Sequence, residues 1–346
     1  MNQKNVLMIG PARSVKGGMT TVVDNYYNYG LNKKVNLKYI ETVNDSNNIS
    51  KFLKELKGII EFRKYINDYD IVHIHMASRR STFRKGKYVR IAKNKGKRVI
   101  LHIHGAEYKV FYDECNKKQK EYVRNTLNLA DKIIVLSEEW ENYFRNLVKK
   151  EKICVIYNSI VIPKDFVKNL DTKKILFLGR IGKRKGIYDL LDVIERLIKK
   201  YPDIKLYVGG DGEINKIKLI TEEKKLQDNV IYVGWVSKRE KEELLTDCSY
   251  FVLPSYNEGM PMSVLEGMAY RNITISTNVG GIPKIIQDKE NGMIIHPGDK
   301  ESLYNNFDRL FEDKELRKKL SANGRKTIED KFNIEKVINQ LIELYK

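Results

Sequence analysis

Short apolar runs recur along the chain, and most are followed by a polar or glycine-containing turn and an amphipathic stretch of helical period. A buried parallel strand produces such a run, and a helix then carries the chain back to the next strand. The pattern therefore predicts an α/β fold built on doubly wound parallel sheets. The predicted strands lie at residues 6–9, 35–40, 70–75, 98–104, 131–137 and 153–158, and then at 174–179, 206–209, 230–236 and 250–253.

The 346 residues suit two domains of ordinary size. A connector at 163–172 separates the two series of strands, so we expect a first Rossmann-like domain at 1–165 and a second at 170–331. The three cysteines form no C-x-x-C pair, and no apolar run approaches the roughly 18 residues of a membrane span. The apolar start is also too short for a signal peptide, so we expect a globular cytoplasmic protein.

Positive charge is concentrated in the first half of the chain. Residues 1–165 contain 32 Lys and Arg against 17 Asp and Glu, while residues 166–346 contain 32 against 28. No acidic residue lies between Asp70 and Glu107, a segment that favours phosphates, an anionic membrane surface or nucleic acid, although a solvated helix also explains it. The cations of this segment are Arg79, Arg80, Arg84, Lys85, Lys87, Arg90, Lys93, Lys95, Lys97 and Arg98.

Two predicted strands each end in a pair of histidines, His73 with His75 and His102 with His104. Alternation along a strand puts both members of a pair on one face. We expect His75 and His104 at the strand ends in an open crevice, and the other two nearer the core. A metal site is disfavoured, because the carboxylate or cysteine companions and the H-x-x-x-H spacing of familiar sites are missing.

Two turns are candidate phosphate sites. Gly17 and Gly18 precede a helix, where backbone N–H groups can approach an anion, but their spacing fits a plain tight turn equally well. Arg180 and Lys185 follow the strand at 174–179 in the cationic turn G-R-I-G-K-R-K-G. Guanidinium and ammonium groups at a helix N-terminus stabilise the charge of a departing diphosphate.

Glu258 and Glu266 flank the start of a predicted helix, so that the first lies in the preceding loop and the second inside the helix. Both can face a crevice at the carboxyl ends of a parallel sheet and bind a hydroxyl-rich ligand. Their E-x7-E spacing, with the G-G-I-P turn at 280–283, resembles the nucleotide-sugar site of retaining glycosyltransferases of family 4, which have the GT-B fold. The G-R-x4-K-G turn is similar to that family's diphosphate motif, and the resemblance covers almost the whole chain.

The resemblance implies two Rossmann-like domains with a catalytic crevice between them and a final helix, 332–346, that packs back on the first domain. It places Glu266 on the ribose hydroxyls and Glu258 on the donor sugar, with the diphosphate held by the cationic turn. The implied catalytic residues are His104, Glu258, Arg180 and Lys185. The other implied donor-binding residues are Gly17, Gly18, Gly259, Met260, Gly280 and Gly281.

The implied reaction moves a hexosyl-type group from a nucleotide diphosphate sugar, with UDP favoured, to an acceptor hydroxyl with retention of configuration. No carboxylate is placed as a covalent nucleophile, and without a D-x-D pair neither a metal nor another cofactor is expected. The segment after His75 resembles enzymes that build bacterial capsule or exopolysaccharide on a lipid-diphosphate carrier. The residues expected to meet this acceptor or the inner face of the membrane, giving peripheral attachment, are His75, Arg79, Arg80, Arg84 and Lys85.

Two other functions fit parts of the sequence. A nucleic-acid-binding protein would explain the charge, but no aromatic stacking platform interleaves with the cations, so nucleic acid is not the expected partner. A GT-B-like UDP-sugar epimerase or a non-catalytic sugar-nucleotide binder would keep the donor motifs. The residues at 270–272 and Lys284 depart from the family pattern and leave the donor sugar open.

Overall fold

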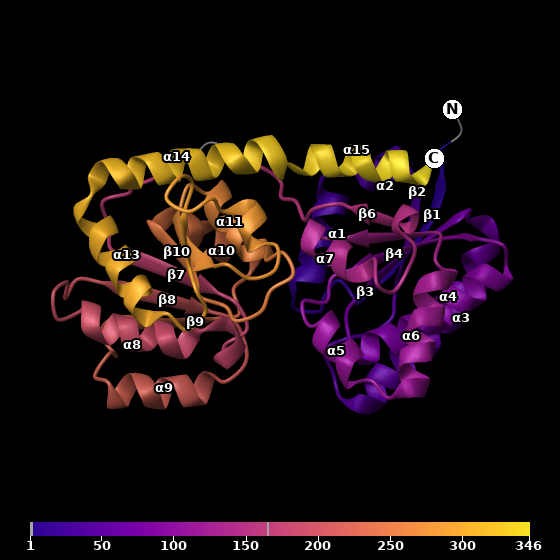
Figure 1. The fold of residues 1–346 in the computed structure, drawn as a ribbon, viewed down its shortest axis with the longest axis horizontal. Helices are drawn as coiled ribbons and strands as arrows, with labels where there is room; N and C mark the ends of the chain where they lie inside the picture. The colour runs from indigo at the N-terminus through magenta and orange to yellow at the C-terminus, as the bar shows by residue number, and fades with distance from the viewer. Residues whose placement is uncertain (1–2, 165) are drawn as a thin grey trace. The chain divides into compact units, whose positions relative to one another are not determined.

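The computed structural model of the chain describes residues 3–164 and 166–346. The chain divides into two compact units (Figure 1). The first comprises the residues up to Val161 together with Ile334–Lys346, and the second comprises Ile162–Asn333.

The first unit is built on a six-stranded parallel sheet of order β2-β1-β3-β4-β5-β6. All six residues of its central strand β3 are buried, as expected where helices cover both faces of a parallel sheet. The strands are β1 Asn5–Gly10, β2 Asn36–Glu41, β3 Ile71–Met76, β4 Arg98–Ile103, β5 Lys132–Val135 and β6 Ile153–Val155. The helices are α1 Gly18–Asn28, α2 Leu31–Lys34, α3 Asn48–Tyr65, α4 Arg80–Asn94, α5 Tyr108–Glu114, α6 Lys117–Leu129, α7 Glu138–Phe144 and α15 Ile334–Tyr345, with short 3-10 turns at Ile66–Asp68 and Lys150–Lys152.

The second unit is built on a six-stranded parallel sheet of order β12-β11-β10-β7-β8-β9. Its strands are β7 Lys174–Leu178, β8 Lys205–Gly209, β9 Val230–Gly234, β10 Tyr250–Leu253, β11 Ile273–Thr277 and β12 Met293–Ile295. Its helices are α8 Ile187–Leu197, α9 Ile214–Glu223, α10 Lys238–Asp247, α11 Met262–Ala269, α12 Ile282–Ile285, α13 Lys300–Glu312 and α14 Lys314–Lys331, with a 3-10 turn at Lys183–Lys185. The predicted class of doubly wound parallel sheets is confirmed.

The terminal helix α15 belongs to the first unit, although the second unit precedes it in sequence. Its apolar face is buried, including Val337 and Leu341. The backbone N–H of Ile334 donates to the carbonyl oxygen of Ile160 at 3.0 Å, and the Tyr345 hydroxyl lies 2.6 Å from Nδ1 of His73. The end of the chain therefore completes the core around β3.

The strand orders show where a ligand would bind. In an open parallel sheet, ligands bind at the carboxyl ends of the strands where the order reverses. This point lies between β1 and β3 in the first unit and between β7 and β10 in the second. Within the described ranges, no helix is long and apolar enough to cross a membrane.

Candidate functional site

The loop after β10 is fastened to the turn after β7. The backbone N–H of Tyr256 donates to the carbonyl oxygen of Arg184 at 2.8 Å, and the Arg184 guanidinium donates to the carbonyl oxygen of Asn257 at 2.9 Å. Gly186 has a φ of 71°, and a Cβ there would lie 2.0 Å from the carbonyl oxygen of Pro254. Only glycine permits this approach, so the sequence holds the two loops together at the reversal point of the sheet.

Lys185 and Glu258 meet between these loops as an ion pair. Their side chains are only 13% and 6% exposed, and the Ser255 hydroxyl also donates to Oε1 of Glu258 at 2.7 Å. Buried charges are tolerated when they are paired and hydrogen-bonded in this way. Arg180, from the same turn as Lys185, is exposed.

The glycine turn after β11 packs against the Glu258 loop. Gly280 has a φ of 54°, and a Cβ there would lie 1.9 Å from the carbonyl oxygen of Glu258. The backbone N–H of Gly281 donates to the carbonyl oxygen of Gly259 at 2.6 Å, and Met260 is buried beside it. The structure thus brings six of the predicted donor-binding residues together: Lys185, Glu258, Gly259, Met260, Gly280 and Gly281.

Glu266 lies inside α11 and is buried. Its Oε1 pairs with the ammonium of Lys241 from α10 at 2.5 Å. Sequence reasoning missed Lys241, because nothing separates it from the other charged residues of the helix around it. The sequence prediction also missed Ser255, although a serine three residues before Glu258 is close enough for a local hydrogen bond.

Gly17 and Gly18 form the start of α1, at the reversal point of the first sheet. Both are exposed, and no side chain of the described residues caps the helix. The Thr20 hydroxyl instead donates to the carbonyl oxygen of Gly17 at 2.6 Å. The first backbone N–H groups of α1 are therefore accessible to an anion, as predicted from the sequence.

The four histidines of β3 and β4 form one stack, with neighbouring ring centroids 4.1 to 5.4 Å apart. His75 is fully buried, so the prediction that it lies in an open crevice is wrong. The reason is that β3 continues to Met76 and pairs with β4 in this region, opposite His102. His104 follows the end of β4 and is only partly buried.

Burial keeps the histidines neutral. It lowers the pKa of His73 to about 3 and the pKa of His75 and of His102 well below the usual value of 6.5, and the pKa of the partly buried His104 shifts in the same direction. Neutral imidazole is the form that binds metals, and His73, His75 and His102 offer ligand atoms within 4.8 Å of one another. Their rings are stacked at 14° to 29°, however, whereas a metal lies in the plane of each imidazole that binds it. Three stacked rings do not converge on one such point, and the expectation of a metal-free protein stays a prediction.

His75 determines the tautomer of His104. Nδ1 of His75 lies 2.9 Å from Nε2 of His104, and Nε2 of His75 is buried with no partner in the described chain. A buried bare nitrogen is better tolerated than an unpaired N–H, so we infer that the proton of His75 is on Nδ1 and is donated to His104. His104 then carries its own proton on Nδ1 and presents a neutral N–H donor.

Lys85 does not belong to a cationic surface, and its predicted contact with acceptor or membrane is wrong. The helical period places it on the inner side of α4 with Tyr88 and Val89, which are also buried. Its ammonium donates to the hydroxyl of Thr42, and burial lowers the pKa of Lys85 well below its usual value.

Arg79, just before α4, and two further cations of α4 are paired with carboxylates of neighbouring elements. Arg80 remains exposed, while Arg84 is partly buried and its Nε has no partner among the described residues. The segment is therefore less cationic at its surface than its composition predicts. The ion pairs are Arg79–Glu114 at 2.7 Å, Lys87–Glu55 at 2.9 Å and Lys93–Asp131 at 2.8 Å.

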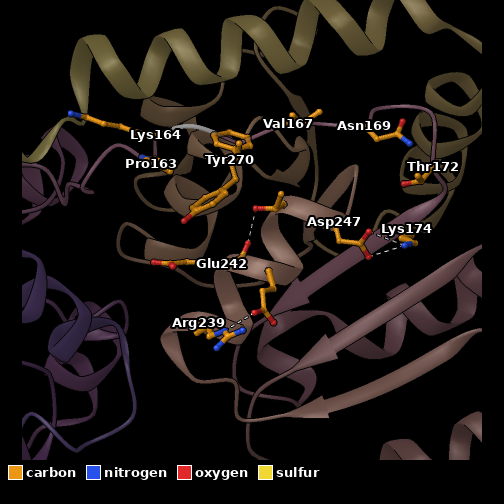
Figure 2. A pocket seen from close by; sticks show the side chains of 13 residues that line it. Pro163, Lys164, Val167, Asn169, Thr172, Lys174, Arg239, Glu242, Asp247 and Tyr270 are labelled. Atoms are coloured by element: carbon orange, nitrogen blue, oxygen red, sulfur yellow. Dashed lines mark hydrogen bonds and ion pairs between the residues drawn. The ribbon is translucent and has the colours of Figure 1, made fainter.

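A pocket of about 900 Å³ lies elsewhere in the second unit, between residues 163–164 and 166–174, α10 and Tyr270 (Figure 2). Four of its charged side chains pair with one another, in Lys174–Asp247 at 2.8 Å and Arg239–Glu243 at 2.8 Å. None of the predicted site residues lines it. The pocket therefore adds nothing to the assignment of the donor site.

Two family models match consecutive parts of the chain. Residues 35–162 match Glycosyltransferase Family 4, and residues 158–327 match Glycosyl transferases group 1. The capsular polysaccharide biosynthesis glycosyltransferase CapM of Staphylococcus aureus is 30% identical over 62% of this chain and 61% of its own length. A glycosyltransferase of Haemophilus influenzae, itself uncharacterized, is 30% identical over 61% of this chain and 60% of its own length. The chain thus spans about three fifths of these relatives.

A solved structure shares the fold over its full length. The Anabaena HepE protein in complex with UDP-glucose is 15% identical, with a TM-score of 0.80 over 98% of each chain. The two family models together run from residue 35 to residue 327, so the chain is similar to glycosyltransferases over most of its length, and its two parallel sheets match the GT-B fold of its structural neighbours.

Proposed function

We propose that the chain transfers a hexosyl-type sugar from a UDP-sugar to a hydroxyl of a lipid-diphosphate-linked saccharide in capsule or exopolysaccharide synthesis. The transfer retains the anomeric configuration and uses no metal. The observation that carries the proposal is the buried pair of Lys185 and Glu258 at the reversal point of the second sheet.

The free oxygens of the two glutamates support their proposed roles. Oε1 of Glu258 receives both the Lys185 and the Ser255 contacts, which leaves Oε2 for a hydroxyl of the donor sugar. In Glu266, Oε1 is bound to Lys241, and Oε2 is left for the ribose. A carboxylate with one anchored oxygen is a fixed acceptor and orients its ligand.

The cationic turn supports the assignment of the diphosphate. Lys185 is already held in place by Glu258, so a diphosphate that binds beside it meets an ammonium that needs no further ordering. Arg180 is exposed in the same turn and is available for a second contact. Negative charge grows on the leaving diphosphate as the glycosidic bond breaks, so both cations stabilise the transition state more than the ground state.

The donor and acceptor classes are supported by the similar proteins. The Anabaena structure contains UDP-glucose, and the S. aureus relative is named for capsular polysaccharide synthesis. A lipid-linked acceptor places the reaction at the cytoplasmic face of the membrane, and we propose peripheral attachment there.

The test is release of UDP from a panel of UDP-sugars with and without a polyprenyl-diphosphate saccharide, in the presence of EDTA. We expect acceptor-dependent release, and an α-linked product from an α-configured donor by NMR. Lys185→Ala should reduce turnover at least 100-fold, whereas Lys183→Ala, an exposed cation of the same turn, should stay within a few-fold of the parent. Donor conversion without acceptor would identify an epimerase, and binding without turnover would identify a sugar-nucleotide binder.

A further inference from the structure

Helix α3 presents an apolar face to solvent. Five of the twelve large apolar side chains exposed in the described part of the chain lie on this one helix. Isolated exposed apolar residues are ordinary, but a contiguous group marks an interaction surface. The five are Ile49, Phe52, Leu53, Leu56 and Ile60, each 46% to 73% exposed.

The five side chains share one side of the helix. At 3.6 residues per turn their positions fall within an arc of about 100°. The opposite side of α3 packs on the protein, where a Cβ on Gly58 would lie 2.9 Å from the carbonyl oxygen of Glu41, and the Phe62 ring lies 5.1 Å from that of Tyr88. The exposed arc therefore faces away from the first unit and is not part of its core.

The charge at the border of this arc is positive. Lys57, Arg63 and Lys64 are exposed, and within the described residues none of them pairs with a carboxylate. The two acidic residues of α3 are turned to other elements, where they form the ion pairs Glu55–Lys87 at 2.9 Å and Glu61–Lys38 at 3.6 Å. Unpaired cations beside an apolar stripe match the surface of an anionic bilayer, which offers negative headgroups above an acyl interior.

We propose that α3 lies in the surface of an anionic lipid bilayer, with the five apolar side chains inserted among the acyl chains. This proposal rests on the peripheral membrane attachment that is part of the proposed function, and it locates that attachment on α3. It moves the contact from the basic helix α4, where Lys85 is buried and Lys87 and Lys93 are paired, to α3. Vesicle binding needs neither donor nor acceptor, so this proposal and the transferase proposal can fail separately.

The experiment is flotation of the full chain with vesicles of phosphatidylcholine containing phosphatidylglycerol, and with phosphatidylcholine alone. Leu56→Glu places a charge in the apolar arc. Leu219→Glu, on α9 of the second unit, is the matched control, because Leu219 is also an exposed helical leucine at 60%. We expect the wild type to bind anionic vesicles at least tenfold better than neutral ones, Leu56→Glu to bind them at least tenfold more weakly, and Leu219→Glu to match the wild type.

Unchanged melting and UDP binding of Leu56→Glu would show that the variant is folded. No vesicle binding by the wild type, or equal binding by Leu56→Glu, would overturn the proposal. A wild type that is dimeric without lipid, with a monomeric Leu56→Glu, would show that a second copy of the chain covers α3, and that result would also overturn it.

Discussion

Acid should destabilise the first unit well before its carboxylates are protonated, because its buried histidines resist protonation. Burial lowers the pKa of His73 to about 3, while in the unfolded chain a histidine has a pKa near 6.5. Below pH 6.5 the unfolded state binds more protons than the folded state, so stability is complete above this pH and is lost as the pH falls toward 3. Each buried histidine lowers the unfolding free energy by about 1.4 kcal/mol for every pH unit below 6.5, which is about 2 kcal/mol at pH 5 for His73 alone.

The other three histidines of the stack act in the same direction. The assay is urea unfolding at pH 7 and pH 5, followed by the fluorescence of Trp140, which packs against the core of the first unit. Trp235→Phe removes the tryptophan of the second unit, so that the signal reports one unit only. His296→Gln, in the second unit and exposed, is the control and should leave the pH dependence of the Trp140 signal unchanged. An unfolding free energy that is equal at the two pH values would refute the reasoning.

Three further substitutions test separate features. Gly280→Ala should abolish UDP binding, because its Cβ would clash with the carbonyl oxygen of Glu258 and displace the loop. Gly96→Ala, also at a positive φ but with no atom within 4 Å, should lower the free energy of unfolding by only about 1 kcal/mol, and equal effects of the two substitutions would contradict the role of the close approach. Glu266→Gln should weaken UDP binding about tenfold by calorimetry with an unchanged melting temperature, since it keeps the shape but loses the charge; equal affinity would remove Glu266 from the ribose site. Lys85→Met replaces a buried amine by an apolar chain of similar length, so it should raise the unfolding free energy of the first unit by about 1 kcal/mol or leave it unchanged, and it should not alter vesicle binding. Weaker vesicle binding by this variant would show that Lys85 contacts the membrane after all.

Most of the fold was predictable because the apolar runs are local signals, although β11 and β12 were not predicted as strands. Each predicted strand up to β10 overlaps a strand of one of the two sheets, and the alternation with helices fixed the parallel class. The end of one strand was predicted wrongly: the apolar run predicted a strand at 153–158, but β6 ends at Val155. Pairing with a neighbour decides such an end, and pairing is not local.

The site was predictable only where a motif carried it. The glycines at 280 and 281 and the cationic turn were found because they resemble motifs of the family, and the structure explains why glycine is needed at 280. The partners of the glutamates were not found, because Lys241 comes from a different helix and meets Glu266 only after folding. The burial of His75 and Lys85 was missed for the same reason, since strand alternation and charge counts do not reveal what covers a side chain.

The most direct test of the central claim is calorimetric titration of the full chain with UDP, in EDTA, for the wild type and for Lys185→Ala. We expect one site in the wild type and an affinity at least tenfold weaker in the variant, with the melting temperature of the free proteins unchanged. Absence of binding by UDP and by other nucleoside diphosphates, or equal affinity in the two proteins, would contradict the assignment of the Lys185 and Glu258 pair as the donor site.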